Sequence, residues 1–123
     1  HLANDTKRPI LLVISASDCG YCELLKTEFL RPMIESGEYA KRIIIREWMI
    51  DEVGDFRDFQ GREVDPQALA TRYRAPVTPT LLFLDGAGNE LVEPMIGING
   101  LDFYGWYLDQ AISAARVRLL GHD

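Results

Sequence analysis

The sequence of 123 residues contains only two cysteines and two histidines, and it lacks any apolar run long enough to cross a bilayer. Its longest apolar run, residues 9–16, has the length of one strand, whereas a membrane-spanning helix needs about 20 residues. Basic residues are outnumbered, 13 against 19 acidic ones, and they form no cluster that could follow a phosphate backbone. We therefore expect neither a transmembrane segment nor a nucleic-acid partner.

The two cysteines, Cys19 and Cys22, lie close together in the stretch SASDCGYCELLKTEF. Two are too few for the disulfide framework of a small secreted scaffold, and a bridge over so short a loop constrains the unfolded chain little. A zinc or iron–sulfur site needs about four ligands, yet the histidines stand at the chain ends, at His1 and His122. We therefore favour a redox pair and expect no metal, while a structural disulfide and a metal site completed by carboxylates stay open.

The order of the predicted elements indicates one α/β domain. Apolar periodicity and the positions of proline and glycine predict strand 9–16, helix 22–36, strand 42–51, helix 65–74, strands 79–85 and 90–97, and helix 101–120. The strands on either side of the first helix should be parallel, and the last two should form an antiparallel hairpin. We expect Pro32 to kink or end the first helix, and Ala68, Leu69 and Tyr73 to form the apolar face of the second.

The position of the cysteine pair at the start of a helix favours thiol–disulfide exchange. Unpaired N–H groups and the positive end of the helix dipole favour a thiolate there, and the thiolate is the attacking species. We predict that Cys19 is the nucleophile and that Cys22, one turn further along and more buried, resolves the mixed disulfide. Gly20 should let the turn approach closely.

A second motif, RAPVTPTLLFLDGAGNE at residues 74–90, contains a proline that can form a cis peptide bond after Thr78. Together with the apolar strand, C-G-Y-C and a strand ending in Gly97, it makes the chain resemble the thioredoxin superfamily over about residues 8–115. The resemblance implies a thioredoxin fold, a single domain over residues 1–123 with a four-stranded mixed sheet and helices on both faces, in the order β-α-β-α-β-β-α.

The same resemblance implies the substrate-binding residues. Pro79 would be cis and would face the cysteines, although an ordinary edge-strand proline stays open as an alternative. Thr78 would pair with a substrate strand by β-addition, and Gly97 would border the same groove. Gly20 and Tyr21, between the cysteines, complete the expected substrate-binding set.

Within the superfamily the chain is similar to periplasmic thioredoxin-like proteins, including the SoxW type, and its C-G-Y-C also occurs in Dsb-type disulfide isomerases. The similarity implies a monomeric thiol–disulfide oxidoreductase that reduces protein disulfides, with no cofactor beyond its own disulfide. The chain begins without an initiator methionine or signal region, which suggests an exported bacterial protein processed at its N-terminus, with a membrane-bound thiol donor of electrons. A disulfide isomerase or oxidase and a non-catalytic binding module are the alternatives.

Several residues depart from the usual thioredoxin pattern. Tyr21 replaces a proline, Asp18 replaces a tryptophan, and Val13 stands where a buried aspartate would be. The charge of Asp18 should oppose formation of the Cys19 thiolate, so we expect Asp18 and Tyr21 to influence redox potential and partner choice. Glu47 aligns with a family lysine, and we expect it either to relay protons to Cys22 or to be an ordinary paired carboxylate.

Two groups of aromatic residues complete the candidates. We expect the group in the last helix to pack in the core and over the rim of the sheet rather than to form a partner surface: Phe103, Tyr104, Trp106 and Tyr107. The polar excursion 52–64 should turn at Gln60 and Gly61, and its Phe56 and Phe59 either have no special role or help to recognise the substrate.

Overall fold

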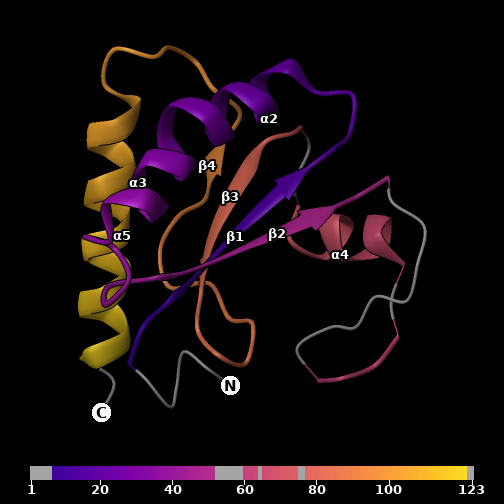
Figure 1. Ribbon diagram of the computed structural model, residues 1–123. Helices are drawn as coiled ribbons and strands as arrows, with labels where there is room; N and C mark the ends of the chain where they lie inside the picture. Colours follow the sequence, from indigo (N-terminus) through magenta and orange to yellow (C-terminus); the bar gives the residue numbers. More distant parts are fainter. Residues whose placement is uncertain (1–6, 52–59, 64, 75–76, 122–123) are drawn as a thin grey trace.

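The computed structural model describes residues 7–51, 60–63, 65–74 and 77–121, and these form a four-stranded sheet with flanking helices (Figure 1). The strands are β1 (Ile10–Ser15), β2 (Ile44–Met49), β3 (Thr80–Leu84) and β4 (Met95–Ile96). Their order across the sheet is β2-β1-β3-β4. β1 pairs with β2 in parallel, and β3 is antiparallel to both β1 and β4. The predicted mixed sheet of the thioredoxin fold is confirmed.

The helices are α2 (Gly20–Leu25), a π-helical segment (Lys26–Leu30), α3 (Arg31–Ser36), α4 (Pro66–Arg72) and α5 (Tyr104–Leu120). The first three segments follow one another without a break, so the helix does not end at Pro32. Pro32 lies in the first turn of α3, directly after the π-helical segment, and its missing N–H leaves out one hydrogen bond of the continuous helix. The wider turn before it is closed by the N–H of Arg31, which bonds to the carbonyl of Lys26. The helix ends at Gly37, which takes a left-handed conformation with φ of 75°.

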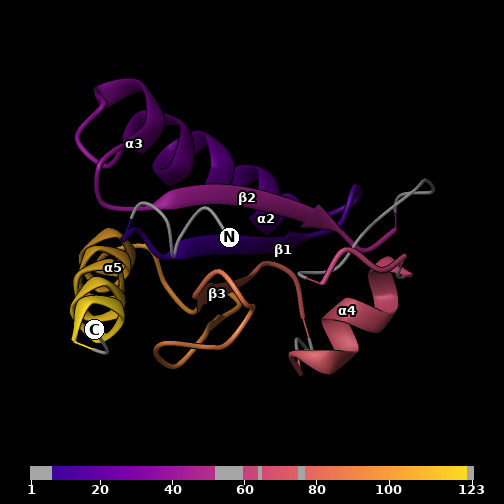
Figure 2. The ribbon, with the colours of Figure 1, turned by 90° about the horizontal axis from the view of Figure 1, so that it is seen from below.

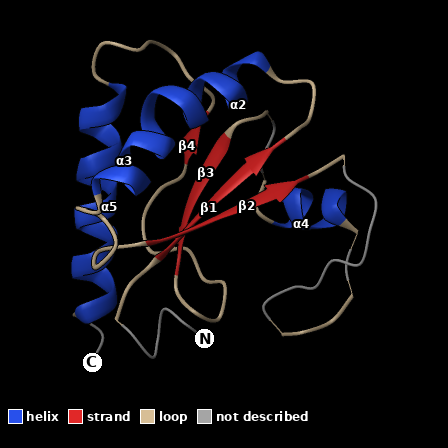
Figure 3. Ribbon diagram, in the orientation of Figure 1, coloured by secondary structure: helices blue, strands red, loops and turns tan. Residues whose placement is uncertain are grey.

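The sheet separates two apolar clusters, because neighbouring side chains of a strand point to opposite faces. In Figure 2, α2 and α3 lie on one side of β1 and β2, and α4 lies on the other. On one face Leu11 and Val13 of β1 pack with Leu25 of α2 and with the buried side of α5. On the other face Leu12 and Ile14 pack with α4. β1 is buried at every position, as predicted for a central strand. It carries the redox segment at its carboxyl end, where α2 begins (Figure 3).

The predicted second strand of the hairpin, 90–97, is mostly not a strand, since β4 contains only Met95 and Ile96. Leu84 pairs with Glu90 near the turn, and Leu81 pairs with Met95. Three steps along β3 therefore correspond to five steps along the returning chain, so two residues leave the ladder between these pairs. Pro94 lies in this interval, and it has no N–H to donate to a neighbouring strand.

The predicted apolar face of α4 is partly wrong. Tyr73 is buried beside Ala70, whereas Ala68 is exposed. In the excursion, Gly61 takes a left-handed conformation with φ of 79°, as a turn there requires, and Gln60 donates to the carbonyl of Ala87. Phe56 and Phe59 lie outside the described residues. Across the described residues, none of the helices is long and apolar enough to span a bilayer.

Candidate redox site

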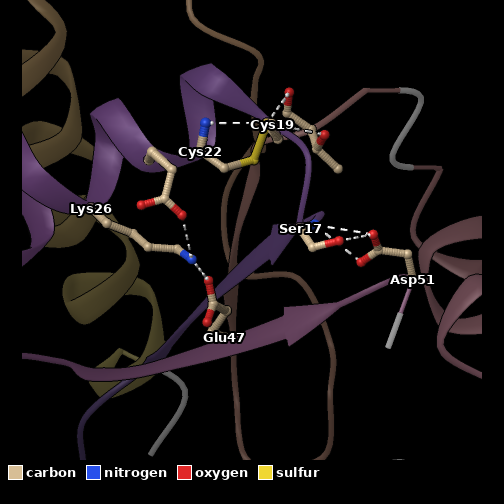
Figure 4. Close-up of polar contacts among 8 residues, drawn as sticks. Ser17, Cys19, Cys22, Lys26, Glu47 and Asp51 are labelled. Atoms are coloured by element: carbon tan, nitrogen blue, oxygen red, sulfur yellow. Dashed lines mark hydrogen bonds and ion pairs between the residues drawn. A yellow bond between two sulfur atoms is a disulfide. The ribbon is translucent and has the colours of Figure 1, made fainter. Parts of the chain in front are cut away.

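Cys19 and Cys22 form a disulfide at the start of α2, with their Cα atoms 5.2 Å apart (Figure 4). Cys19 is the N-cap residue, with an extended backbone, and its Sγ accepts the N–H of Cys22 over 3.1 Å. The two sulfurs differ in access, because Cys22 is fully buried while Cys19 is partly exposed. An incoming substrate can therefore reach Cys19 first, which agrees with its predicted role as nucleophile.

The loop before β3 lies against Cys19 although it is 59 positions away in sequence. The peptide bond between Thr78 and Pro79 is cis. The Thr78 hydroxyl donates to Cys19 Sγ over 3.4 Å, and the Thr78 carbonyl oxygen lies 3.6 Å from the same sulfur. Pro79 itself is buried, and its predicted position facing the cysteines stays a prediction.

Two hydrogen-bond donors are directed at Cys19 Sγ, one from the Cys22 backbone and one from the Thr78 side chain. Donors in these positions stabilise negative charge on this sulfur once the disulfide opens. Asp18 precedes it and is exposed, so its carboxylate opposes that charge through solvent. The geometry therefore favours Cys19 as the sulfur that leaves and attacks as a thiolate.

The glycines of the site have different roles. Gly97 has a left-handed conformation with φ of 66°, and its N–H donates to the Pro79 carbonyl over 2.8 Å. It therefore lies at the Pro79 loop, as the resemblance implied. A Cβ at Gly20 would have no atom within 4 Å, so the expected close approach at Gly20 is wrong. Gly20 leaves open space beside the disulfide, and Tyr21 next to it is exposed.

Glu47 of β2 forms an ion pair with Lys26, whose ammonium lies 2.5 Å from the carboxylate and 3.7 Å from Glu23 (Figure 4). Glu47 lies beside Val13 in the parallel register, on the face of the sheet that α2 covers. Lys26 stands one helical turn after Cys22. The structure thus connects Glu47 through Lys26 to the turn that carries Cys22, and its proton-relay role stays a prediction.

Sequence reasoning missed the contact between Ser17 and Asp51. Asp51 accepts the Ser17 N–H on both carboxylate oxygens, each over 3.1 Å, and it also accepts the Ser17 hydroxyl. These hydrogen bonds lower the pKa of the Asp51 carboxyl. The parallel pairing could have revealed this contact, because Ser15 aligns with Met49 and two further steps bring Ser17 level with Asp51.

The prediction for the aromatic residues of the last helix is wrong for three of the four. Tyr104 is buried and contacts the ring of Phe29, with ring centroids 5.0 Å apart. Phe103, Trp106 and Tyr107 are exposed. Helical geometry explains part of this division, because Leu108, four positions after Tyr104, shares its buried face, whereas Trp106, two positions after it, points to the opposite side.

The comparisons with known proteins agree with this geometry. A family model described as a thioredoxin-like domain matches residues 1–110. Among curated proteins there is no match. No group of three or more residues suited to holding a metal ion occurs in the described part of the chain.

Solved structures with this fold include three thioredoxin-type proteins. The reduced periplasmic thioredoxin SoxS of Paracoccus pantotrophus is 19% identical, with a TM-score of 0.58 over 88% of this chain and 99% of its own. A thioredoxin of Thermus thermophilus is 22% identical, with a TM-score of 0.66 over 99% of this chain and 85% of its own. The oxidoreductase DsbH is 21% identical, with a TM-score of 0.65 over 94% and 80%.

Proposed function

The chain belongs to the thioredoxin-like family and is a thiol–disulfide oxidoreductase, and from this premise we propose that it reduces disulfide bonds in other proteins. The observation that carries the proposal is the arrangement of the pair. An accessible Cys19 sulfur lies at a helix N-cap beside Thr78, and a fully buried Cys22 lies one turn behind it.

The reaction starts from the reduced pair and transfers two electrons. The Cys19 thiolate attacks one sulfur of the substrate disulfide, so that the substrate S–S bond breaks, a mixed disulfide forms and the departing sulfur takes up a proton. Cys22 then loses its proton and attacks Cys19 Sγ, which releases the second substrate sulfur as a thiolate. The substrate ends as a dithiol and the protein ends as the Cys19–Cys22 disulfide.

Thr78 and its neighbours supply the substrate-binding surface in this proposal. A substrate strand pairs with the Thr78 backbone by β-addition, which places its disulfide next to Cys19. Support comes from the 3.6 Å approach of the Thr78 carbonyl to Cys19 Sγ and from the position of Gly97 at Pro79. Gly20 leaves room for the substrate, and Tyr21 borders it.

The charge of Asp18 favours reduction as the direction of electron flow, whereas the two donors at Cys19 Sγ act in the opposite direction by stabilising its thiolate. The carboxylate of Asp18 raises the free energy of a neighbouring thiolate but has little effect on a neutral disulfide. A less stable reduced form makes a pair a better electron donor, whereas an oxidant stabilises its reduced form. An isomerase or oxidase that uses the same two cysteines is the alternative.

The compartment proposed is the bacterial periplasm or another exported location, where a thiol donor at the membrane keeps the pair reduced. The periplasmic relative SoxS, which shares the fold, supports this proposal. Such a donor is needed because a dithiol with one accessible cysteine otherwise becomes a disulfide in an oxidising compartment. The protein is proposed to act as a monomer.

A redox titration of the pair tests the direction of flow. Reduced and oxidised protein are separated by thiol alkylation after equilibration with glutathione or dithiothreitol buffers. We expect a potential near that of thioredoxins, about −270 mV, and a value near −120 mV would instead indicate an oxidant. Cys22→Ser should trap substrates as mixed disulfides on Cys19 in cell extracts. Cys19→Ser should abolish turnover, and a variant that still retains its partners without turnover would support the binding-module alternative.

A further inference from the structure

A groove of about 590 Å³ lies along β4 and the segment that leads from it into α5. Apolar and aromatic side chains form most of its walls, including Ile96, Phe103 and Tyr107. Phe103 exposes 68% of its surface and Tyr107 exposes 58%. Among the lining residues that the structure describes, Asp102 alone is charged. Exposed aromatic residues gathered around a groove are typical of a surface that binds another molecule.

This groove begins next to the Pro79 loop of the redox site. Gly97 lines the groove and donates its N–H to the Pro79 carbonyl. Pro79 directly follows Thr78, whose hydroxyl contacts Cys19 Sγ. A protein whose disulfide reaches Cys19 therefore passes the start of the groove, and its next residues can enter it.

The backbone of β4 has a free edge in the same place. The bond from Gly97 N–H to the Pro79 carbonyl makes Thr80 and Ile96 a non-hydrogen-bonded pair of the antiparallel ladder. The N–H and C=O of Ile96 therefore point away from β3. Within the described chain they have no partner, and β4 is the last strand on its side of the sheet. An edge of this kind can accept an added strand.

We propose that this groove binds an extended apolar segment of the substrate protein, adjacent to the cysteine that Cys19 attacks. The proposal rests on the proposed function, since it assumes a protein substrate. The segment pairs with Ile96 through one N–H and one C=O, and its apolar side chains pack between Phe103 and Tyr107. It is uncharged or basic, because the chain has a net charge of -6. The same charge disfavours a second copy of this chain as the occupant.

Two peptide disulfides test the proposal, each a peptide with one cysteine joined to glutathione. The first has valine and leucine on both sides of the cysteine, and the second has serine and threonine at those positions, with equal length and charge. The second-order rate constant for oxidation of the reduced protein is measured by quenching and mass spectrometry. We expect the apolar peptide to react at least tenfold faster. Hydroxyethyl disulfide, which is too small to reach the groove, reports the chemistry of the cysteines alone.

Variants and modified peptides identify the groove as the cause. Phe103→Ser should bring the apolar peptide close to the rate of the polar one and leave the hydroxyethyl disulfide rate unchanged. Val117→Ser is the control, because Val117 is an exposed apolar residue of α5 that does not line the groove. N-methylation of the apolar peptide at successive positions should lower its rate at the position that pairs with Ile96.

The outcomes separate this inference from the proposed function. Equal rates for the two peptides, with normal reduction of hydroxyethyl disulfide, would overturn the groove and leave the oxidoreductase assignment intact. Equal slowing of all three disulfides by Phe103→Ser would show a structural role and would also overturn it. A reduced protein that reacts with none of the three would overturn both. A dimer that Phe103→Ser dissociates would assign the groove to a second copy instead.

Discussion

The carboxylate of Asp51 holds the loop before the redox pair through Ser17. It accepts both the backbone N–H and the hydroxyl of Ser17, two residues before Cys19 (Figure 4). Because Asp51 lies two residues after β2 and Ser17 lies two residues after β1, the contact ties the carboxyl ends of the two parallel strands together. The loop that positions Cys19 is therefore fixed from one side by Asp51 and contacted from the other by Thr78.

Asp51→Asn should make the protein less sensitive to acid. The hydrogen bonds from Ser17 lower the pKa of Asp51 below its ordinary value of 3.8. A carboxyl with a depressed pKa in the folded state adds stability above its unfolded pKa and loses it as the pH falls through the folded pKa. Between pH 5 and about pH 3 the melting temperature should therefore fall more steeply in the wild type than in Asp51→Asn. Parallel melting curves at each pH would show that the contact adds no ionic stabilisation.

Thr78→Val should slow the chemistry of Cys19 with little effect on the fold. The change keeps the branched shape and removes the hydroxyl that donates to Cys19 Sγ over 3.4 Å. A hydrogen bond to a charged group contributes about 1.5 kcal/mol or less at so long a distance, so alkylation of reduced Cys19 at pH 7 should slow about three- to tenfold. Thr78→Ser is the control and should keep the wild-type rate. Equal alkylation rates for Thr78→Val and Thr78→Ser would show that the hydroxyl does not stabilise the Cys19 thiolate.

Tyr104→Phe should make the protein more resistant to alkali. Burial raises the pKa of Tyr104 to about 12, and its hydroxyl has no hydrogen-bond partner among the described residues. A raised pKa means that the folded state holds the proton more tightly, so stability is complete below about pH 10 and falls as the pH rises towards 12. The wild type should lose melting temperature between pH 9 and pH 11 faster than Tyr104→Phe. Near pH 7 the variant should be as stable as the wild type or slightly more so, because the ring contact with Phe29 is retained.

The fold could be predicted well because its signals are local or belong to known motifs. The apolar run of β1 indicates a strand buried on both faces, and the helix after it begins at the cysteine pair. The predicted start of the last strand at residue 90 was wrong. Leu91 and Val92 have a strand-like sequence, but Pro94 and the two extra residues remove this segment from the ladder. Composition alone does not reveal a change of register.

The residues of the site also fall into those that sequence motifs reveal and those that they do not. Cys19, Cys22 and the Pro79 loop were found from sequence motifs, and the structure brings Cys19 and Thr78 together. The exposure of Phe103 and Tyr107 was missed, because aromatic residues are usually buried and the sequence does not show where a helix stops being covered. The groove beside them depends on the loop between β4 and α5, whose path no periodic pattern specifies.

Glu47→Gln should slow the step in which Cys22 attacks the mixed disulfide. Cys22 is buried and must lose a proton at that step, and the Glu47–Lys26 pair lies at the turn that follows it. Removing the Glu47 charge should lower the resolution rate about tenfold, less than a typical general base, because a half-exposed carboxylate shares its role with water. Glu23→Gln is the matched control, since Glu23 also pairs with Lys26 but is more exposed. Rapid-quench measurement of the mixed disulfide gives the rate directly, and equal rates in the wild type and Glu47→Gln would leave Glu47 as an ordinary paired carboxylate.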